Sequence, residues 1–129
     1  MERNEGINKL SKRYTISRLF RGKEIIMVME QLKEGVSILL SGGDLSHIGA
    51  VYIRDNENNI IKHSFKSHKD YVLAEEWMNR LADVCNVPIV VTVGIHYDDI
   101  SLEEITKIQN ISADMLNEAC LQIKSRLEQ

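Results

Sequence analysis

The sequence has no long hydrophobic run, very little proline or cysteine, and no marked excess of charge of either sign. Its 129 residues include one proline and two cysteines, and the formal net charge is −3. No apolar stretch approaches the roughly 18 residues that a membrane-spanning helix needs. Residues 1–14 lack the apolar core of a secretion signal. These absences predict a cytoplasmic protein that does not enter a membrane.

The composition and length predict one globular domain. Hydrophobic residues make up 43% of the chain and charged residues 27%, which is ordinary for a globular protein. We predict a polar N-terminal extension over residues 1–13 and a single domain over residues 14–129. The Lys and Arg residues are scattered rather than gathered in a stripe, which argues against a nucleic-acid-binding protein.

Familiar catalytic motifs are also absent. The chain has no G-x-S-x-G sequence, no P-loop, no dinucleotide fingerprint, no H-E-x-x-H and no paired-cysteine zinc motif. Cys85 and Cys120 fall on the apolar stripes of predicted helices, so we interpret them as small buried hydrophobic residues. The sequence therefore predicts no catalytic turnover, although a small metal-dependent enzyme stays open as an alternative.

The first half of the chain has the alternation and turn residues of strands. Short connections favour antiparallel neighbours, because a parallel crossover needs a dozen or more residues. We therefore predict an antiparallel β-meander in this half. Its expected strands are residues 14–21, 24–32, 36–40, 47–54 and 60–65.

The second half changes to the helical period. Apolar residues recur every three to four positions over residues 69–86, and Pro88 then opens an apolar segment, residues 88–95, that we predict to be an interior strand. Ser101 and Glu104 form a capping box before a long amphipathic helix. Strands followed by helices predict an α+β fold, an antiparallel β-meander sheet with two main helices packed on one face.

Two polar clusters interrupt this pattern. The first lies in the segment GGDLSHIG at the end of a predicted strand. Its glycines would let backbone N–H groups approach a phosphate, and its aspartate and histidine could bind a metal, but a glycine-rich hairpin facing water is the other interpretation. Gly49, inside a strand, indicates a bulge or a group resting on the backbone. The residues of interest are Gly42, Gly43, Asp44, Ser46, His47 and Gly49.

The second cluster, Gly94 to Asp99, joins the predicted interior strand to the capped helix. His96 and Asp98 could be ligands, or the aspartates could merely solvate the loop and complement the positive end of the helix. Together the two clusters suit Mg, Mn or Zn through Asp44, His47, His96 and Asp98. His68, at the expected start of the first helix, is a weaker candidate ligand.

The segments GGDLSHIGAV and HKDYVLAEEWMNRLADVCNVPIVVTVGIHYDDISLEEI resemble the prenylated-flavin chaperones, the small D-subunit-like proteins of non-oxidative decarboxylase systems, known as LpdD-like. The resemblance runs from about Val36 to the C-terminus and implies a fold like that of proteasome assembly chaperones. It implies a non-catalytic carrier of prenylated FMN, with a divalent metal as a further expected ligand. The implied flavin-binding residues are Gly42, Gly43, Asp44, Ser46, His47, Gly49, His68, Gly94 and His96.

The resemblance also implies partners: a flavin prenyltransferase that makes the cofactor and a UbiD-type decarboxylase that receives it. A protein-interaction scaffold with no small ligand is the alternative. In the strand at residues 24–32, Ile25, Met27 and Met29 alternate with Ile26 and Val28, so both faces of the sheet are apolar. One face would stay uncovered by helices, and we therefore predict a homodimer.

Overall fold

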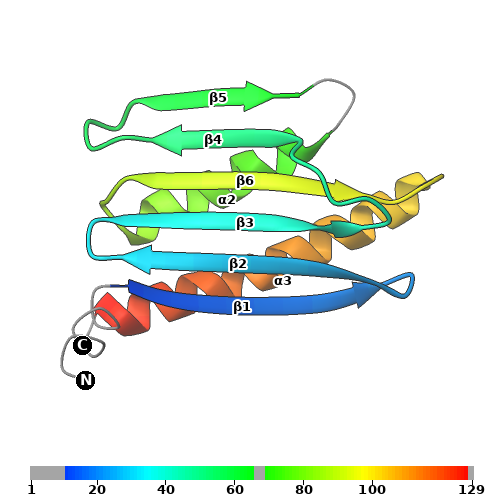
Figure 1. Cartoon of the computed structure of the whole chain (residues 1–129), viewed down its shortest axis with the longest axis horizontal. Coiled ribbons are helices and arrows are strands. Elements are labelled where there is room, and N and C mark those ends of the chain that lie inside the picture. The colour runs from blue at the N-terminus through cyan, green and yellow to red at the C-terminus, as the bar shows by residue number, and fades with distance from the viewer. Residues whose placement is uncertain (1–10, 66–68, 128–129) are drawn as a thin grey trace.

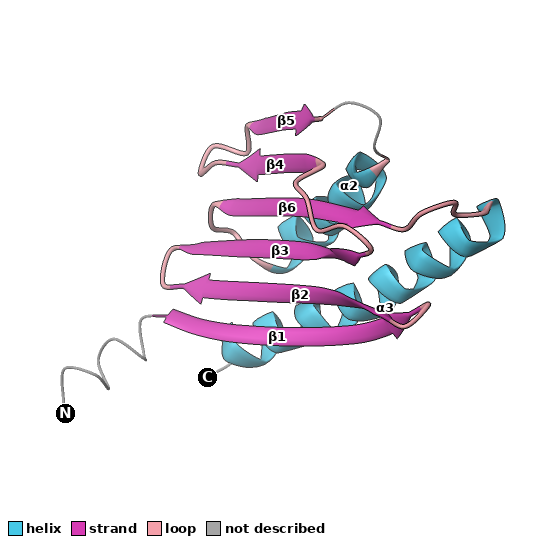
Figure 2. Cartoon of the chain, turned by 45° about the vertical axis from the view of Figure 1, so that its right-hand side comes forward, coloured by secondary structure: helices cyan, strands magenta, loops and turns pink. Residues whose placement is uncertain are grey.

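The computed structural model describes residues 11–65 and 69–127 and shows a single six-stranded sheet with two helices on one face. Figure 1 looks onto the face of the sheet that lies opposite the helices, with α2 and α3 behind the sheet. The turned view in Figure 2 places both helices on the same side. The α+β class and the packing of two helices on one face are confirmed. The strands are β1 (Ser11–Phe20), β2 (Lys23–Leu32), β3 (Gly35–Gly43), β4 (Ala50–Arg54), β5 (Ile60–Ser64) and β6 (Ile89–His96).

The first three strands form the predicted meander. β1 and β2 pair antiparallel from Ser11 opposite Leu32 to Phe20 opposite Lys23, which leaves Arg21 and Gly22 as a two-residue turn. Both turn residues have positive φ, 54° and 74°, the pattern that matches the twist of a tight hairpin. β1 begins at Ser11, three residues before the predicted start of the domain.

The meander does not continue from β3 to β4, and here the prediction is wrong. The strand order is β1-β2-β3-β6-β4-β5, so β6 lies between β3 and β4 (Figure 1). β6 pairs parallel with β3 and antiparallel with β4, which makes the sheet mixed. The connection over residues 44–49 is long enough to step across one strand, about 5 Å per spacing. β6 is an interior strand, as predicted.

Alternate residues of each strand face the helices and form the core. Ile25, Met27 and Met29 of β2 are fully buried there, as are Ile89, Val91 and Val93 of β6. The core also takes in Trp77 of α2, whose indole Nε1 donates to Ser112 Oγ at 2.8 Å. Burial of this single polar group is therefore compensated by a hydrogen bond.

The two helices are α2 (Asp70–Val84) and α3 (Leu102–Leu127). The predicted capping box is present: Glu104 N donates to Ser101 Oγ, and Ser101 N donates to the Glu104 carboxylate, both at 3.1 Å. Cys85 and Cys120 are buried as predicted, and burial raises the pKa of both thiols. Within the described residues, neither helix is long and apolar enough to cross a membrane.

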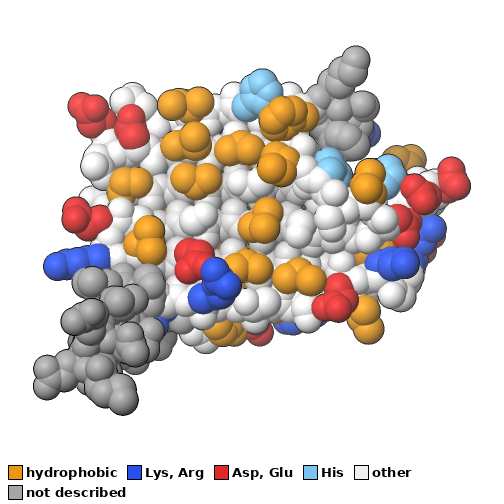
Figure 3. Space-filling model, viewed as in Figure 1, with side chains coloured by type: hydrophobic (Ala, Val, Ile, Leu, Met, Phe, Trp, Pro, Cys, Tyr) orange, Lys and Arg blue, Asp and Glu red, His pale blue; other side chains and the backbone are white. Residues whose placement is uncertain are grey.

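On the opposite face of the sheet the described residues form no helix, and this face is largely apolar. Figure 3 shows hydrophobic side chains spread over β5, β4, β6 and β3 on this side. We call this surface the open face, and the strand registers assign to it Ile26, Val28, Leu39, Val51, Ile53, Ile61 and Val90. Both faces of β2 are thus apolar, as the alternation in the sequence indicated.

Candidate functional site

The two polar clusters meet at one edge of the sheet. β3 and β6 run parallel, and their last residues, Gly43 and His96, are register partners. The chain leaves both strands on the same side, where α2 and α3 also begin (right-hand edge of Figure 1). Crevices outside the carboxyl ends of parallel strands are frequent ligand sites. We call Asp44, His47, Asp70, His96 and Asp98 the polar cluster.

Asp70 joins α2 to the sheet. Its carboxylate is 5% exposed, accepts a 3.0 Å hydrogen bond from Ile95 N, and lies 3.0 Å from His47 Nε2. β4 begins at Ala50, opposite Val93, so the N–H of Ile95 lies beyond the strand pairing on that side. Asp70 supplies the missing acceptor, and the start of α2 adds a favourable positive dipole.

The second half of the polar cluster is more exposed. His96 Nε2 lies 2.9 Å from Asp98 Oδ1, and Asp44 Oδ2 accepts a 2.9 Å bond from Asp98 N. Asp44 N in turn donates to His96 O at 2.7 Å. The β3–β4 connection and the β6–α3 connection are therefore tied together by both backbone and side-chain bonds.

His47 and His96 lie side by side, with ring centroids 6.2 Å apart and planes nearly perpendicular. Each imidazole pairs with a carboxylate: His47 pairs with Asp70, and His96 pairs with Asp98. Within residues 11–65 and 69–127, no group of three or more His, Cys, Asp or Glu side chains could hold a metal ion. The expected divalent-metal site is thus not supported.

The glycines at this edge are required by close contacts within the protein. A Cβ at Gly94 would collide with the carbonyl of His47, and one at Gly49 would collide with the Asp70 carboxylate. Gly43 has φ +91° and lies against the carbonyl of His96, while Gly42 lies against β2. The expectation that something rests on Gly49 is met by Asp70. A phosphate-binding role for the Gly42–Gly43 backbone stays a prediction.

Tyr97 holds the loop after β6 in place. It is 3% exposed, its hydroxyl donates to Lys23 O at 3.1 Å, and its ring makes an edge contact with Phe20. Arg21 lies over the ring and donates to Asp98 O at 2.9 Å. Burial and the nearby Asp44 charge raise the pKa of the Tyr97 phenol, which favours its protonated, donating form.

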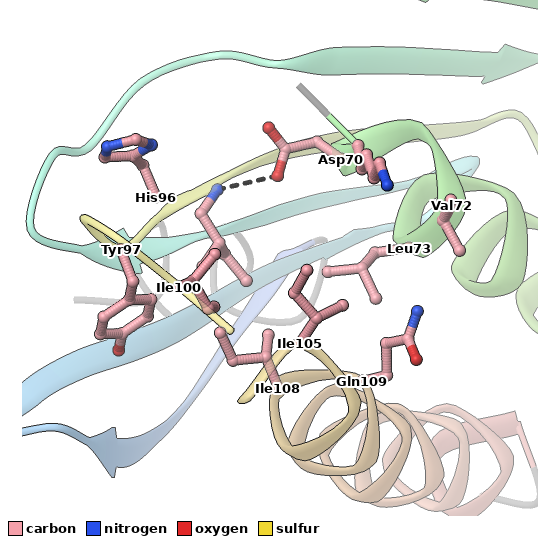
Figure 4. Close-up of a pocket in the computed structure, with 11 residues that line it drawn as sticks. Asp70, Val72, Leu73, His96, Tyr97, Ile100, Ile105, Ile108 and Gln109 are labelled. Atoms are coloured by element: carbon pink, nitrogen blue, oxygen red, sulfur yellow. Dashed lines mark hydrogen bonds between the residues drawn. The ribbon is translucent and has the colours of Figure 1, made fainter. Parts of the chain in front are cut away.

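A cavity of about 340 Å³ adjoins the polar cluster between the starts of α2 and α3. Figure 4 shows Leu73, Ile105 and Ile108 directed toward a common space, with the His96 ring turned away at the edge. Asp70 lies at the top of this view, bonded to the backbone of Ile95. The other lining residues are Lys69, Val72, Ile95, Tyr97, Ile100 and Gln109.

Two predicted residues remain, and two features of this site were not predicted. Ser46 is exposed in the β3–β4 connection. His68 lies outside the described residues. Asp70 was missed, because an acidic residue in the first turn of a helix is ordinarily explained by the helix dipole alone. The aliphatic cavity lining was missed as well, since its residues have the spacing of ordinary core positions.

Comparison with known proteins identifies the family. The model of the prenylated flavin chaperone LpdD-like domain matches residues 20–124. This range includes both polar segments, GGDLSHIG and Gly94 to Asp99. No curated protein matches the chain significantly.

Among solved structures, the chain is similar to one from a complex described as a novel chaperone complex for yeast 20S proteasome assembly. The TM-score is 0.59 at 12% identity, and the match covers 88% of this chain and 98% of the other. This similarity shows a shared fold. Because the family model matches residues 20–124, most of the chain, the chain belongs to the prenylated flavin chaperone LpdD-like family.

Proposed function

We propose that this protein binds prenylated FMN at the polar cluster and the adjoining cavity and delivers it to a UbiD-type decarboxylase. The observation that carries the proposal is the family match, because the matched range includes both segments that form this edge. The geometry supports it, since the two segments lie together beside a cavity of about 340 Å³, within the size range of small-molecule sites.

The binding test uses the two histidines. His47→Ala and His96→Ala should each weaken binding of reduced prenylated FMN by about tenfold or more, or ~1.4 kcal/mol. His63→Ala is the matched control, because His63 is an exposed residue on β5 and contacts Phe65 instead. Anaerobic fluorescence titration and native mass spectrometry give the affinities. Parent-like binding by both variants would move the site elsewhere.

Delivery needs a separate experiment. We expect an apo decarboxylase of the UbiD type to gain activity faster when a flavin prenyltransferase and this protein are both supplied than with the prenyltransferase alone. The purified protein by itself should not decarboxylate an aromatic acid. Equal activation without the protein would contradict the delivery step and leave flavin binding to be judged on its own.

The second candidate function is a protein-interaction scaffold without a small ligand. The open face favours it, because large uncovered apolar surfaces usually mark interfaces. Flavin titration discriminates between the two: a scaffold would bind neither FMN nor prenylated FMN, whereas a carrier would bind the prenylated form.

On either function we propose a homodimer formed through the open face. Leu39 and Ile61 are 41% and 59% exposed there, and the charged pair Arg13–Glu30 near its margin is internally neutralised by a 2.6 Å hydrogen bond. A second copy would therefore meet little like charge, and two-fold pairing is the commonest symmetric solution. Light scattering should show a dimer, and Leu39→Glu should convert it to a monomer. A parent protein that is monomeric at tens of micromolar would refute this arrangement.

A further inference from the structure

The cavity beside the polar cluster has a chemically divided lining. Its inner wall is aliphatic, formed by Leu73 and Ile108, which are buried, and by half-buried Ile95, Ile100 and Ile105. Lys69 and Gln109 line it as exposed residues, so their polar groups belong to the mouth. The buried polar residues Asp70 and Tyr97 also line it, but they already bond to Ile95 N and Lys23 O. Among the described lining residues, further polar recognition is thus available only near the entrance.

Asp70, the buried charged residue of the lining, is already engaged. One oxygen of Asp70 accepts the hydrogen bond from Ile95 N, and the other lies 3.0 Å from His47 Nε2. A polar edge of a ligand pushed against the isoleucines would lose its bonds to water without gaining partners there. A hydrocarbon group would gain from the same burial.

The volume fits a small-molecule site. Pockets that bind small ligands have volumes of about 300–1,000 Å³. The cavity here is about 340 Å³ and lies between the starts of two helices that are otherwise packed on the sheet. It is large enough for a branched hydrocarbon together with part of an aromatic ring.

We propose that the inner part of this cavity receives a branched hydrocarbon group of the ligand, while the polar part of the ligand stays outside beside His96. The inference rests on the proposed function, under which that group is the prenyl-derived part of the flavin. The cavity then makes the protein discriminate between prenylated FMN and FMN, whereas the polar cluster contacts what both flavins share.

The experiment compares two substitutions on the same helix. Ile105→Trp fills the cavity, and Leu102→Trp is its control, because Leu102 is 80% exposed and does not line the cavity. We expect Ile105→Trp to weaken prenylated FMN binding by about tenfold, or ~1.4 kcal/mol, while FMN binding changes by less than about twofold. Leu102→Trp should change neither affinity, and circular dichroism should show both variants folded.

A second measurement needs neither flavin nor variant. Titration of the wild-type protein with 3-methyl-2-buten-1-ol, followed by methyl NMR, should shift Ile95, Ile100, Ile105 and Ile108 and leave Ile61 on β5 unmoved. Absence of these shifts, or an equal loss of FMN and prenylated FMN in Ile105→Trp, would overturn the proposal while flavin binding stands. A wild-type protein that binds no flavin refutes the proposed function instead, and the alcohol titration then decides the cavity by itself.

Discussion

The two ends of the parallel pair β3 and β6 use polar groups in different ways. Where the strands begin, Val36 N donates to Pro88 O at 2.9 Å, and the buried Arg54 donates from Nη2 to Cys85 O and Val87 O at 3.0 and 2.9 Å. Those groups satisfy the backbone after α2. Where the strands finish, imidazoles and carboxylates pair with one another beside a cavity.

The difference separates maintenance of the fold from the capacity to bind. At the beginning of the pair a buried cation supports the carboxyl end of a helix, where positive charge is favourable. At the carboxyl ends of the pair the glycines allow two chain segments to touch beside the cavity. Changes at the first end should therefore cost stability alone, while changes at the second should affect both stability and ligand binding.

Alanine in place of glycine at each end gives the largest contrast. Gly94→Ala should destabilise the protein by about 3 kcal/mol, because the added Cβ would collide with the backbone carbonyl of His47. Gly35→Ala is the control, since its Cβ would lie an ordinary 3.7 Å from Pro88 O. Its effect should stay within about 1 kcal/mol in either direction. Urea unfolding measures both, and equal effects would break the comparison.

The next largest loss of stability is expected when Arg54, the buried cation at the amino ends of β3 and β6, is removed. Arg54→Ala should lower the free energy of unfolding by about 2 kcal/mol, because two carbonyls lose a charged donor. Arg13→Ala, which breaks an exposed ion pair with Glu30, should cost less than about 1 kcal/mol. Flavin affinity of folded Arg54→Ala should match the parent. A loss of binding at this end would show that the two ends are coupled.

His47 and His96, at the carboxyl ends of β3 and β6, should differ in their effect on stability when they are replaced. His47→Ala deprives the buried Asp70 of a partner and should cost about 1–2 kcal/mol. His96→Ala removes a partner from Asp98, whose side chain is 69% exposed, and should cost less than about 0.5 kcal/mol. Thermal unfolding measured beside flavin titration separates the structural part of each effect. A larger stability loss for His96→Ala would contradict the assigned burial.

The smallest effect concerns pH at the start of α3. The hydrogen bond from Ser101 N lowers the folded-state pKa of Glu104 from its usual 4.5. A lowered pKa contributes stability that is present above the unfolded value and is lost as the pH falls through the folded value. The Ser101 amide should therefore lose protection from hydrogen exchange as the pH falls below about 4.5. Glu104→Gln should abolish this pH dependence, and its persistence would assign the effect to another group.

Sequence patterns predicted the elements well because their signals are local. The helical period of Trp77, Met78 and Leu81, and the capping box at Ser101, depend on residues a few positions apart. The apolar run after Pro88 indicated an interior strand, and the alternation of Ile25 and Ile26 indicated two apolar faces. The residues of both polar clusters, and the resemblance that carries the function, were also visible in the sequence alone.

Tertiary structure alone decided which strand lies beside β3. The connection of residues 44–49 could close a hairpin or step across one strand, and only long-range packing selects the second. That insertion makes β3 and β6 parallel, brings His47 beside His96, and places Asp70 under Gly49. His47 then pairs with Asp70 and His96 with Asp98, because a side chain bonds to whichever acceptor the fold puts within reach.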